Sequence, residues 1–342
     1  MRGSMAVISP YFCPIDDESG VGGARRAAVA LAGAAGFSET DAGKVAIAVT
    51  EAATNVLKHA GSGEILLRTT DAGVEMLAMD KGPGIADLRD ALRDGQSNSG
   101  TAGIGLGAIS RLAGSFDVYT GEGLGTAVMA HFHPTDHRRV PRQRPVLEIG
   151  AAQAPYPGEE VSGDAWAWVD SSLFVADGLG HGLHAAEAAR EAVKAFEGNR
   201  TGTVRDVVGA IHLALRPTRG AAVAMARLDP QRHIASFCGI GNISGTILAA
   251  GQRRGMISHN GTAGHEASHI AQLEYPMPEG ALLVMHSDGI SAKWDMASYP
   301  GLASRHPSLV AAVLYRDFRR RNDDATVVVA RVRPPDARDG EP

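Results

Sequence analysis

EAATNVLKHAG, residues 51–61, closes the segment that decides the fold of the first half of this 342-residue chain. We predict a helix over Phe37–Gly61, because Ser38 suits an N-cap and Gly61 suits the position after a helix end. Apolar residues recur along it at the spacing of one helix face, at Val45, Val49, Ala52, Ala53 and Val56.

Two polar side chains lie beside this apolar stripe. Glu51 and Asn55 are four residues apart, so they share one helix face. A carboxylate and an amide on a mostly apolar helix are costly unless a polar partner meets them. Both are candidates for ligand contact, and the alternative is an exposed, solvated edge of the helix.

The next segments extend this pattern. Residues 64–70 and 74–80 predict paired strands with a turn at 71–73. Asp80 ends the second strand and leads into Lys-Gly-Pro-Gly at 81–84. A carboxylate in this place can accept a hydrogen bond from an exocyclic amine, while Gly82 and Gly84 let a flat ring approach the backbone.

A glycine-rich loop follows at 94–107 and precedes a predicted helix at 108–113. Gly103, Gly105 and Gly107 lie in it, and a loop of this kind before a helix N-terminus can bind anions. Such a loop alone would also suit a plain linker. A much more specific signal for a nucleotide site is the order in which four features follow one another: the polar pair of the helix, the Asp80 turn, this loop, and Gly-Leu-Gly-Thr at 123–126.

Residues 24–132 resemble the GHKL ATPase superfamily, and within it the RsbT/RsbW switch protein kinases. The resemblance rests on the stretches at 51–61, 80–95, 100–114 and 123–126. It implies a Bergerat-type α/β sandwich that binds ATP and Mg²⁺, with Asn55 on the metal ion and Glu51 as base or orienter of the attacking hydroxyl. The implied phosphate acceptor is a serine of a STAS-domain protein. The implied ATP-binding residues are Asn55, Asp80, Gly82, Gly84, Gly103, Gly105, Gly107 and Thr126.

In the second half, a hairpin is predicted from strands at 166–169 and 173–176 around a turn at 170–172. Asp164 and Asp177 are nearly equidistant from this turn, so they would almost face each other. Opposed like charges destabilise a hairpin unless a cation lies between them.

Further acids stand at the ends of predicted strands. Asp288 follows the apolar run 281–286, and Asp323 and Asp324 precede the strand 327–329. Each alone suits a turn or cap, but together they offer only oxygen ligands, which suits Mg²⁺ or Mn²⁺ better than zinc. Two such cations could activate water for attack on a phosphate ester.

Residues 146–332 resemble the PPM metal-dependent Ser/Thr phosphatases, most closely the bacterial SpoIIE/RsbX branch. The motifs are SGD at 162–164, DGLGHG at 177–182, GIGNISG at 239–245, SDG at 287–289 and DDAT at 323–326. The resemblance implies an α-β-β-α sandwich and catalytic Asp164, Asp177 and Asp288. Its implied metal ligands are Asp164, Asp177, the Gly178 carbonyl, Asp288 and Asp323, with Asp324 as the alternative to Asp323. His181 suits either a phosphate contact or a structural turn.

Composition excludes several other classes. The net charge is −5, spread over both halves, which does not favour nucleic-acid binding. No apolar run is long enough to cross a membrane, and two cysteines make no disulfide framework, so we expect a cytoplasmic protein. The string HEASH at 265–269 matches a zinc-protease motif, but glycines before it and prolines after it break the helix that this chemistry needs.

We therefore expect an α+β chain of two domains, with an ATPase domain at 24–133 and a phosphatase domain at 146–333. An extension at 1–23, a linker at 134–145 and a tail at 334–342 complete the prediction. The expected protein is a bifunctional regulator of partner switching, with serine kinase activity on a STAS-domain or stressosome-type partner and phosphoserine/threonine phosphatase activity. The alternative is a phosphatase whose ATPase domain only senses ATP or sequesters a partner. The sequence leaves the oligomeric state undetermined.

Overall fold

The computed structural model describes residues 4–6, 10–92, 105–135, 147–267 and 269–333. Their contacts divide them into two compact units. The N-terminal unit comprises the described residues within 10–142 and 304–316, and the C-terminal unit comprises the rest. Gly103, most of the linker expected at 134–145 and the tail at 334–342 lie outside the described residues.

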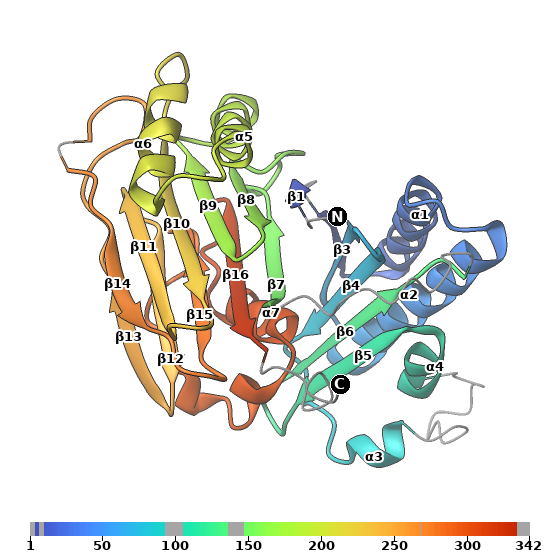
Figure 1. Cartoon of the computed structure of the whole chain (residues 1–342). Helices are drawn as coiled ribbons and strands as arrows, with labels where there is room; N and C mark the ends of the chain where they lie inside the picture. Colours follow the sequence, from blue (N-terminus) through green and yellow to red (C-terminus); the bar gives the residue numbers. More distant parts are fainter. Residues whose placement is uncertain (1–3, 7–9, 93–104, 136–146, 268, 334–342) are drawn as a thin grey trace, which may run out of the picture. The chain divides into compact units, whose positions relative to one another are not determined.

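The N-terminal unit is built on a five-stranded antiparallel sheet, and the helices between residues 18 and 112 cover one face of it (Figure 1). The strand order is β2-β3-β4-β6-β5. Its strands are β2 (Tyr11–Ile15), β3 (Gly63–Thr70), β4 (Gly73–Asp80), β5 (Ser115–Thr120) and β6 (Thr126–Phe132). Its helices include α1 (Glu18–Ala34), α2 (Glu39–Ala60), α3 (Leu88–Ala91) and α4 (Gly105–Leu112).

Helix α2 confirms the helix predicted at Phe37–Gly61. The Ser38 hydroxyl accepts a hydrogen bond from the Asp41 amide at 3.1 Å, which caps the first turn. Gly61 ends the helix with φ of +77°, a conformation that glycine adopts without strain. The predicted apolar stripe is buried and packs with α1 and the sheet in the core of this unit.

The C-terminal unit contains two antiparallel sheets. One has the order β1-β8-β9-β10-β11-β14, and the other has the order β13-β12-β15-β16-β7. The strands of the first are β1 (Ser4–Ala6), β8 (Asp164–Val169), β9 (Ser172–Gly178), β10 (Ala221–Asp229), β11 (Ile234–Ile240) and β14 (Leu273–Pro276). Those of the second are β7 (Leu147–Ala154), β12 (Ser244–Ala249), β13 (Gln252–Met256), β15 (Leu282–His286) and β16 (Ala325–Val332).

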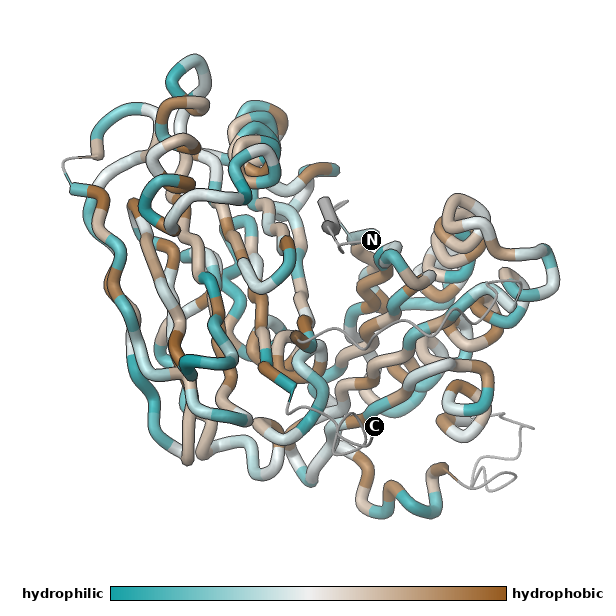
Figure 2. The backbone as a smooth tube through the Cα atoms, in the orientation of Figure 1, coloured by the Kyte–Doolittle hydropathy of each residue, from teal (hydrophilic) through white to brown (hydrophobic). Residues whose placement is uncertain are grey.

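The two sheets enclose an apolar core, with Trp166, Phe237 and Met285 among its buried side chains. Helices α5 (Leu183–Gly198) and α6 (Val204–Ala214) cover the six-stranded sheet and bury a second cluster against it. Figure 2 shows apolar stretches along the strands and hydrophilic residues in many connecting loops. This unit and the N-terminal unit confirm the expected α+β class and its two sandwich domains.

Two features of the structure bear on the expected division of the chain into domains. Part of the expected extension is structured, since β1 pairs with β8 and β2 pairs with β3. Helix α7 (Pro307–Phe318) follows β15 in the sequence, yet the contacts of residues 304–316 group them with the N-terminal unit.

Candidate functional site

The Asp80 turn is held by hydrogen bonds from two separate parts of the N-terminal unit. The Asp80 Oδ1 atom accepts hydrogen bonds from the Gly82 amide at 2.8 Å and from the Thr126 amide at 3.2 Å. Burial raises the pKa of this carboxyl, and these two bonds oppose the rise. The carboxylate is thereby held in one orientation at the end of β4.

Close backbone approach explains the glycines around this turn. A Cβ atom on Gly82 would lie 2.8 Å from the Ala60 Cβ atom, at the end of α2. Gly84 has φ of +82°, and a Cβ there would lie 2.0 Å from the Gly121 carbonyl oxygen. The Thr120 hydroxyl accepts from the Ile85 amide at 2.8 Å, so the loop after Asp80 is tied to the hairpin of β5 and β6.

Helix α2 carries the other predicted polar pair. Glu51 and Asn55 lie one turn apart and are half-buried. Their side chains form no hydrogen bond with the residues that the structure describes, so both can meet a ligand. Helix α2 contacts β4 and α4, and α4 begins at Gly105 with φ of +53° and buries Gly107. The structure thus brings together the elements that carry the predicted ATP-binding residues, apart from Gly103.

In the C-terminal unit, Asp164 and Asp177 are direct partners across β8 and β9, which confirms the predicted register. The turn between these strands includes Asp170 with φ of +53°, which aspartate tolerates better than most residues. Asp164 is buried and Asp177 half-buried. Two carboxylates are thus opposed at the ends of neighbouring strands.

These two carboxylates influence one another and are influenced by three more acids. Burial, followed by the negative charges of Asp164, Asp288, Asp323 and Asp324, raises the pKa of Asp177 to about 10. Burial also raises the pKa of Asp164 to about 8, against a hydrogen bond from Ser287. The acids predicted from distant strand ends therefore converge on one region of the C-terminal unit.

Neighbouring polar groups hold the acids in place. The Ser287 hydroxyl donates to Asp164 Oδ2 at 2.7 Å and accepts from the Thr326 amide at 3.1 Å. The Asn242 side chain donates to Asp288 Oδ2 at 2.7 Å. Ser287, Thr326 and Asn242 were missed by the sequence reasoning, although each lies within a motif that also carries an acid or glycines.

The adjacent residues Asp323 and Asp324 make different contacts. Asp324 is buried, and its Oδ1 atom accepts from the Tyr156 amide at 2.9 Å. Asp323 instead shares a hydrogen bond with Asp288, and burial followed by the Asp288 charge raises the pKa of Asp323 to about 6. Asp324 is thus bonded to backbone, whereas Asp323 is bonded to Asp288 within the acidic cluster.

The donor set fits hard divalent cations. Asp164 Oδ1 and Asp324 Oδ2 are buried without a hydrogen-bond partner in the described part of the chain. Mutually repelling, buried carboxylate oxygens are the ligands that Mg²⁺ and Mn²⁺ favour. Among the described residues, no three His, Cys, Asp or Glu side chains already stand in a metal-binding arrangement. Several of the acids are instead bonded to Ser287, to Asn242 or to each other.

The turn after Asp177 requires glycine. A Cβ on Gly178 would lie 2.1 Å from the Ala185 carbonyl oxygen of α5, and the Gly178 amide donates to the Gly163 carbonyl at 3.1 Å. His181 is exposed, with Nδ1 3.0 Å from Glu159 Oε1 and its ring stacked on Tyr156 at 4.3 Å. These contacts orient the imidazole, which lies close enough to Asp324 to influence the pKa of that carboxyl.

The zinc-protease string receives no support from the backbone. Residues 265–267 and 269 are not helical, as the flanking glycines and prolines predicted. His265 and His269 therefore do not lie one turn apart on a helix, as the zinc-protease motif requires.

Known families match both units. The family "Histidine kinase-like ATPase domain" matches residues 15–132, and "Stage II sporulation protein E (SpoIIE)" matches residues 170–333. The "Serine/threonine-protein kinase RsbT" of Bacillus subtilis (strain 168) is 35 % identical over 99 residues, which are 28 % of this chain and 74 % of that protein. The chain joins an RsbT-like ATPase domain to a SpoIIE-type PPM phosphatase domain.

A solved structure is also similar to just over half of this chain. It comes from work headed "The bacterial stressosome: a modular system that has been adapted to control secondary messenger signaling". The TM-score is 0.50 and the identity 29 %, over 54 % of this chain and 99 % of that one. In the described residues of the fusion, no helix combines the length and the apolar character that spanning a membrane requires.

Proposed function

We propose that this chain sets the phosphorylation of a STAS-domain or stressosome-type partner in the cytoplasm, through opposed kinase and phosphatase activities. The phosphatase half rests on one observation above all, the direct pairing of buried Asp164 with Asp177 beside Asp288 and Asp323. The kinase half rests on the likeness to RsbT and on the Asp80 turn beside α2.

In the phosphatase half, Asp164, Asp177, the Gly178 carbonyl, Asp288 and Asp323 would hold Mg²⁺ or Mn²⁺. Such a pair of ions, when bound, lowers the pKa of water and neutralises charge on a phosphate ester. The chain's own residues orient the ligands: Ser287 fixes Asp164, and Asn242 fixes Asp288. His181, held by Glu159 and Tyr156, would contact the phosphoryl group or donate a proton to the leaving oxygen.

In the kinase half, Asp80 would accept from the adenine amine, because its carboxylate is fixed by the Gly82 and Thr126 amides. Asn55 would hold the Mg²⁺ that accompanies ATP, and Glu51 would orient the serine hydroxyl or take its proton. Gly105 and Gly107 open α4, where backbone amides can meet phosphate. Phosphoryl transfer depends mainly on positioning and charge stabilisation, which this set of residues can supply.

Purified chain, radiolabelled ATP and candidate STAS proteins test the kinase half. Label should pass to a serine of the partner, and Asn55→Ala should abolish the transfer, while Glu39→Gln in the first turn of the same helix should not. Binding of ATP without transfer of label would favour the sensing or sequestering alternative.

Phosphate release from a phosphoserine protein tests the other half. Release should require Mn²⁺ or Mg²⁺ and should be lost in Asp177→Ala and Asp288→Ala. Asp170→Asn is the matched control, since it changes an aspartate of the same hairpin outside the acidic cluster. Persistence of phosphate release in both cluster variants would refute the metal assignment.

A further inference from the structure

The segment 304–316 belongs to the SpoIIE-type match by sequence and to the N-terminal unit by contacts. It contains most of α7, whose residues from Ser308 to Tyr315 are fully buried. Its neighbours on either side, up to Ala303 and from Asp317, belong to the C-terminal unit. The chain therefore leaves one unit, packs in the other and returns.

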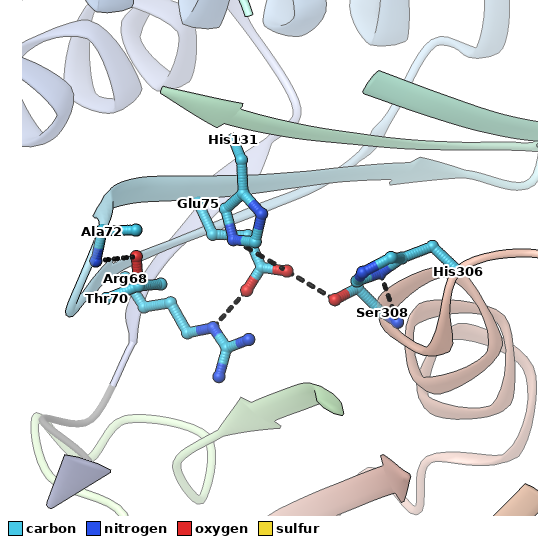
Figure 3. A network of polar contacts seen from close by, with 7 residues as sticks. All are labelled: Arg68, Thr70, Ala72, Glu75, His131, His306 and Ser308. Atoms are coloured by element: carbon cyan, nitrogen blue, oxygen red, sulfur yellow. Dashed lines mark hydrogen bonds and ion pairs between the residues drawn. The ribbon is translucent and has the colours of Figure 1, made fainter. Parts of the chain in front are cut away.

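The beginning of this segment is bonded to β4 and β5. The Ser308 hydroxyl donates to Glu75 Oε1 at 2.5 Å (Figure 3), and both side chains are buried. The His306 amide and the Arg305 guanidinium donate to the two carboxylate oxygens of Asp117 at 3.1 and 3.2 Å. These bonds to carboxylates fix the start of α7 on the sheet.

The end of the segment reaches the Asp80 turn. Arg316 Nη1 donates to the main-chain oxygen of Asp80 at 2.9 Å. A Cβ on Gly125 would lie 2.2 Å from that oxygen and 2.8 Å from Arg316 Nη1, so a glycine must stand there for the guanidinium to reach the turn. The Arg316 charge also lowers the pKa of Asp80, against the effect of burial.

The residues that follow directly are bonded beside the acidic cluster. Within the C-terminal unit, the Ser291 amide donates to the Phe318 carbonyl at 2.9 Å, and the Arg320 amide donates to the Gly289 carbonyl at 2.7 Å. Ile290 and Arg319 form a β-bridge between these bonds. Gly289 is next to Asp288, and Asp323 stands three residues after Arg320.

We propose that Arg316 is a positioning residue for nucleotide binding, and that α7 couples nucleotide occupancy at Asp80 to the phosphatase aspartates. The proposal rests on the proposed function. A ligand that donates a hydrogen bond to the Asp80 carboxylate changes the free energy of this turn, and Arg316 binds the main-chain oxygen of the same turn. The same helix end continues into the bridge beside Asp288, and coupling of this kind is reciprocal.

Binding of a fluorescent ADP to the intact chain, with Mg²⁺ held constant, tests the positioning role. Arg316→Ala should weaken binding about tenfold, the effect of one lost charge-assisted hydrogen bond. Arg316→Lys, which retains a donor and the charge, should recover part of the loss. Arg305→Ala, which removes an anchor at the other end of the segment, should stay within about twofold. Equal binding by Arg316→Ala and the unaltered chain would overturn the proposal.

Hydrolysis of p-nitrophenyl phosphate with Mn²⁺, with and without saturating ADP, tests the coupling. ADP should change the rate in the unaltered chain and in Arg305→Ala, and should no longer do so in Arg316→Ala. A rate that is insensitive to ADP in the unaltered chain would overturn the coupling.

The Asp80→Asn variant separates this proposal from the proposed function. It should abolish binding of the fluorescent ADP. Undiminished binding by Asp80→Asn would refute the nucleotide site itself, whereas loss in Asp80→Asn with no effect of Arg316→Ala would refute only the role of Arg316.

Discussion

Replacing Glu75 by alanine should destabilise the N-terminal unit strongly. Glu75 is 1 % exposed and forms an ion pair with Arg68, which is 8 % exposed, and it accepts from Ser308 (Figure 3). Burial alone would raise the pKa of Glu75, but Arg68, His131 and the two hydrogen bonds outweigh it and lower the pKa to about 2. The carboxylate is therefore charged at neutral pH.

The loss of stability in Glu75→Ala depends on the buried charge that remains after the substitution. Glu75→Ala leaves the buried Arg68 guanidinium without its carboxylate, and breaking a buried pair in this way costs about 3–5 kcal/mol. Glu75→Gln keeps an acceptor for Ser308 and should cost less. The double variant Arg68→Met/Glu75→Leu should lose much less stability than the sum of the two single variants, because it leaves no unpaired buried charge.

Amide hydrogen exchange of the intact chain is the suitable assay, because two units make a single unfolding midpoint ambiguous. The opening free energy of β3 and β4 should fall in Glu75→Ala by an amount in that range. Asp16→Asn, a change at an exposed acid of the same unit, should leave it within about 0.5 kcal/mol. Unchanged protection of β3 and β4 in Glu75→Ala would refute the assigned energy of this network.

The remaining predictions concern the cluster, the glycine turn and a buried histidine. Gly178→Ala should abolish phosphatase activity and destabilise the C-terminal unit, because its Cβ would meet the Ala185 carbonyl oxygen at 2.1 Å. Gly209→Ala in α6, where an added Cβ would meet nothing within 4 Å, should raise the opening free energy of α6 in hydrogen exchange by about 0.4–1 kcal/mol. Burial lowers the pKa of His131 to about 4, so its contribution to stability is complete above the unfolded pKa of about 6.5 and is lost as pH falls towards 4. His131→Gln should therefore weaken the pH dependence of the opening free energy of β6 between these pH values, measured by hydrogen exchange, and an unchanged pH dependence would contradict this. Removal of divalent cations by a chelator should stop phosphate release reversibly, and release that continues in chelator would contradict the metal requirement.

Local sequence patterns predicted much of the fold and of the sites. The caps of α2 follow from Ser38 and Gly61, and the facing of Asp164 and Asp177 follows from counting outward from a short turn. Helix caps and the register of a short hairpin depend on residues close together in the chain, so they can be predicted from a single sequence.

Contacts between distant segments were not predictable in the same way. Glu75 and Ser308 are 233 residues apart, and Arg316 lies 236 residues from Asp80. Neither position carries a local pattern that names its partner. The different surroundings of Asp323 and Asp324 also depend on a distant residue, Tyr156, so adjacent identical side chains could not be told apart.

Calorimetric titration of the intact chain with Mn²⁺ tests the central claim most directly, because it needs no knowledge of the protein substrate. The unaltered chain and Asp170→Asn should bind Mn²⁺ alike, and Asp177→Asn and Asp288→Asn should each weaken binding at least about tenfold. Equal Mn²⁺ affinity in all four proteins would show that the opposed aspartates of β8 and β9 do not form a metal centre.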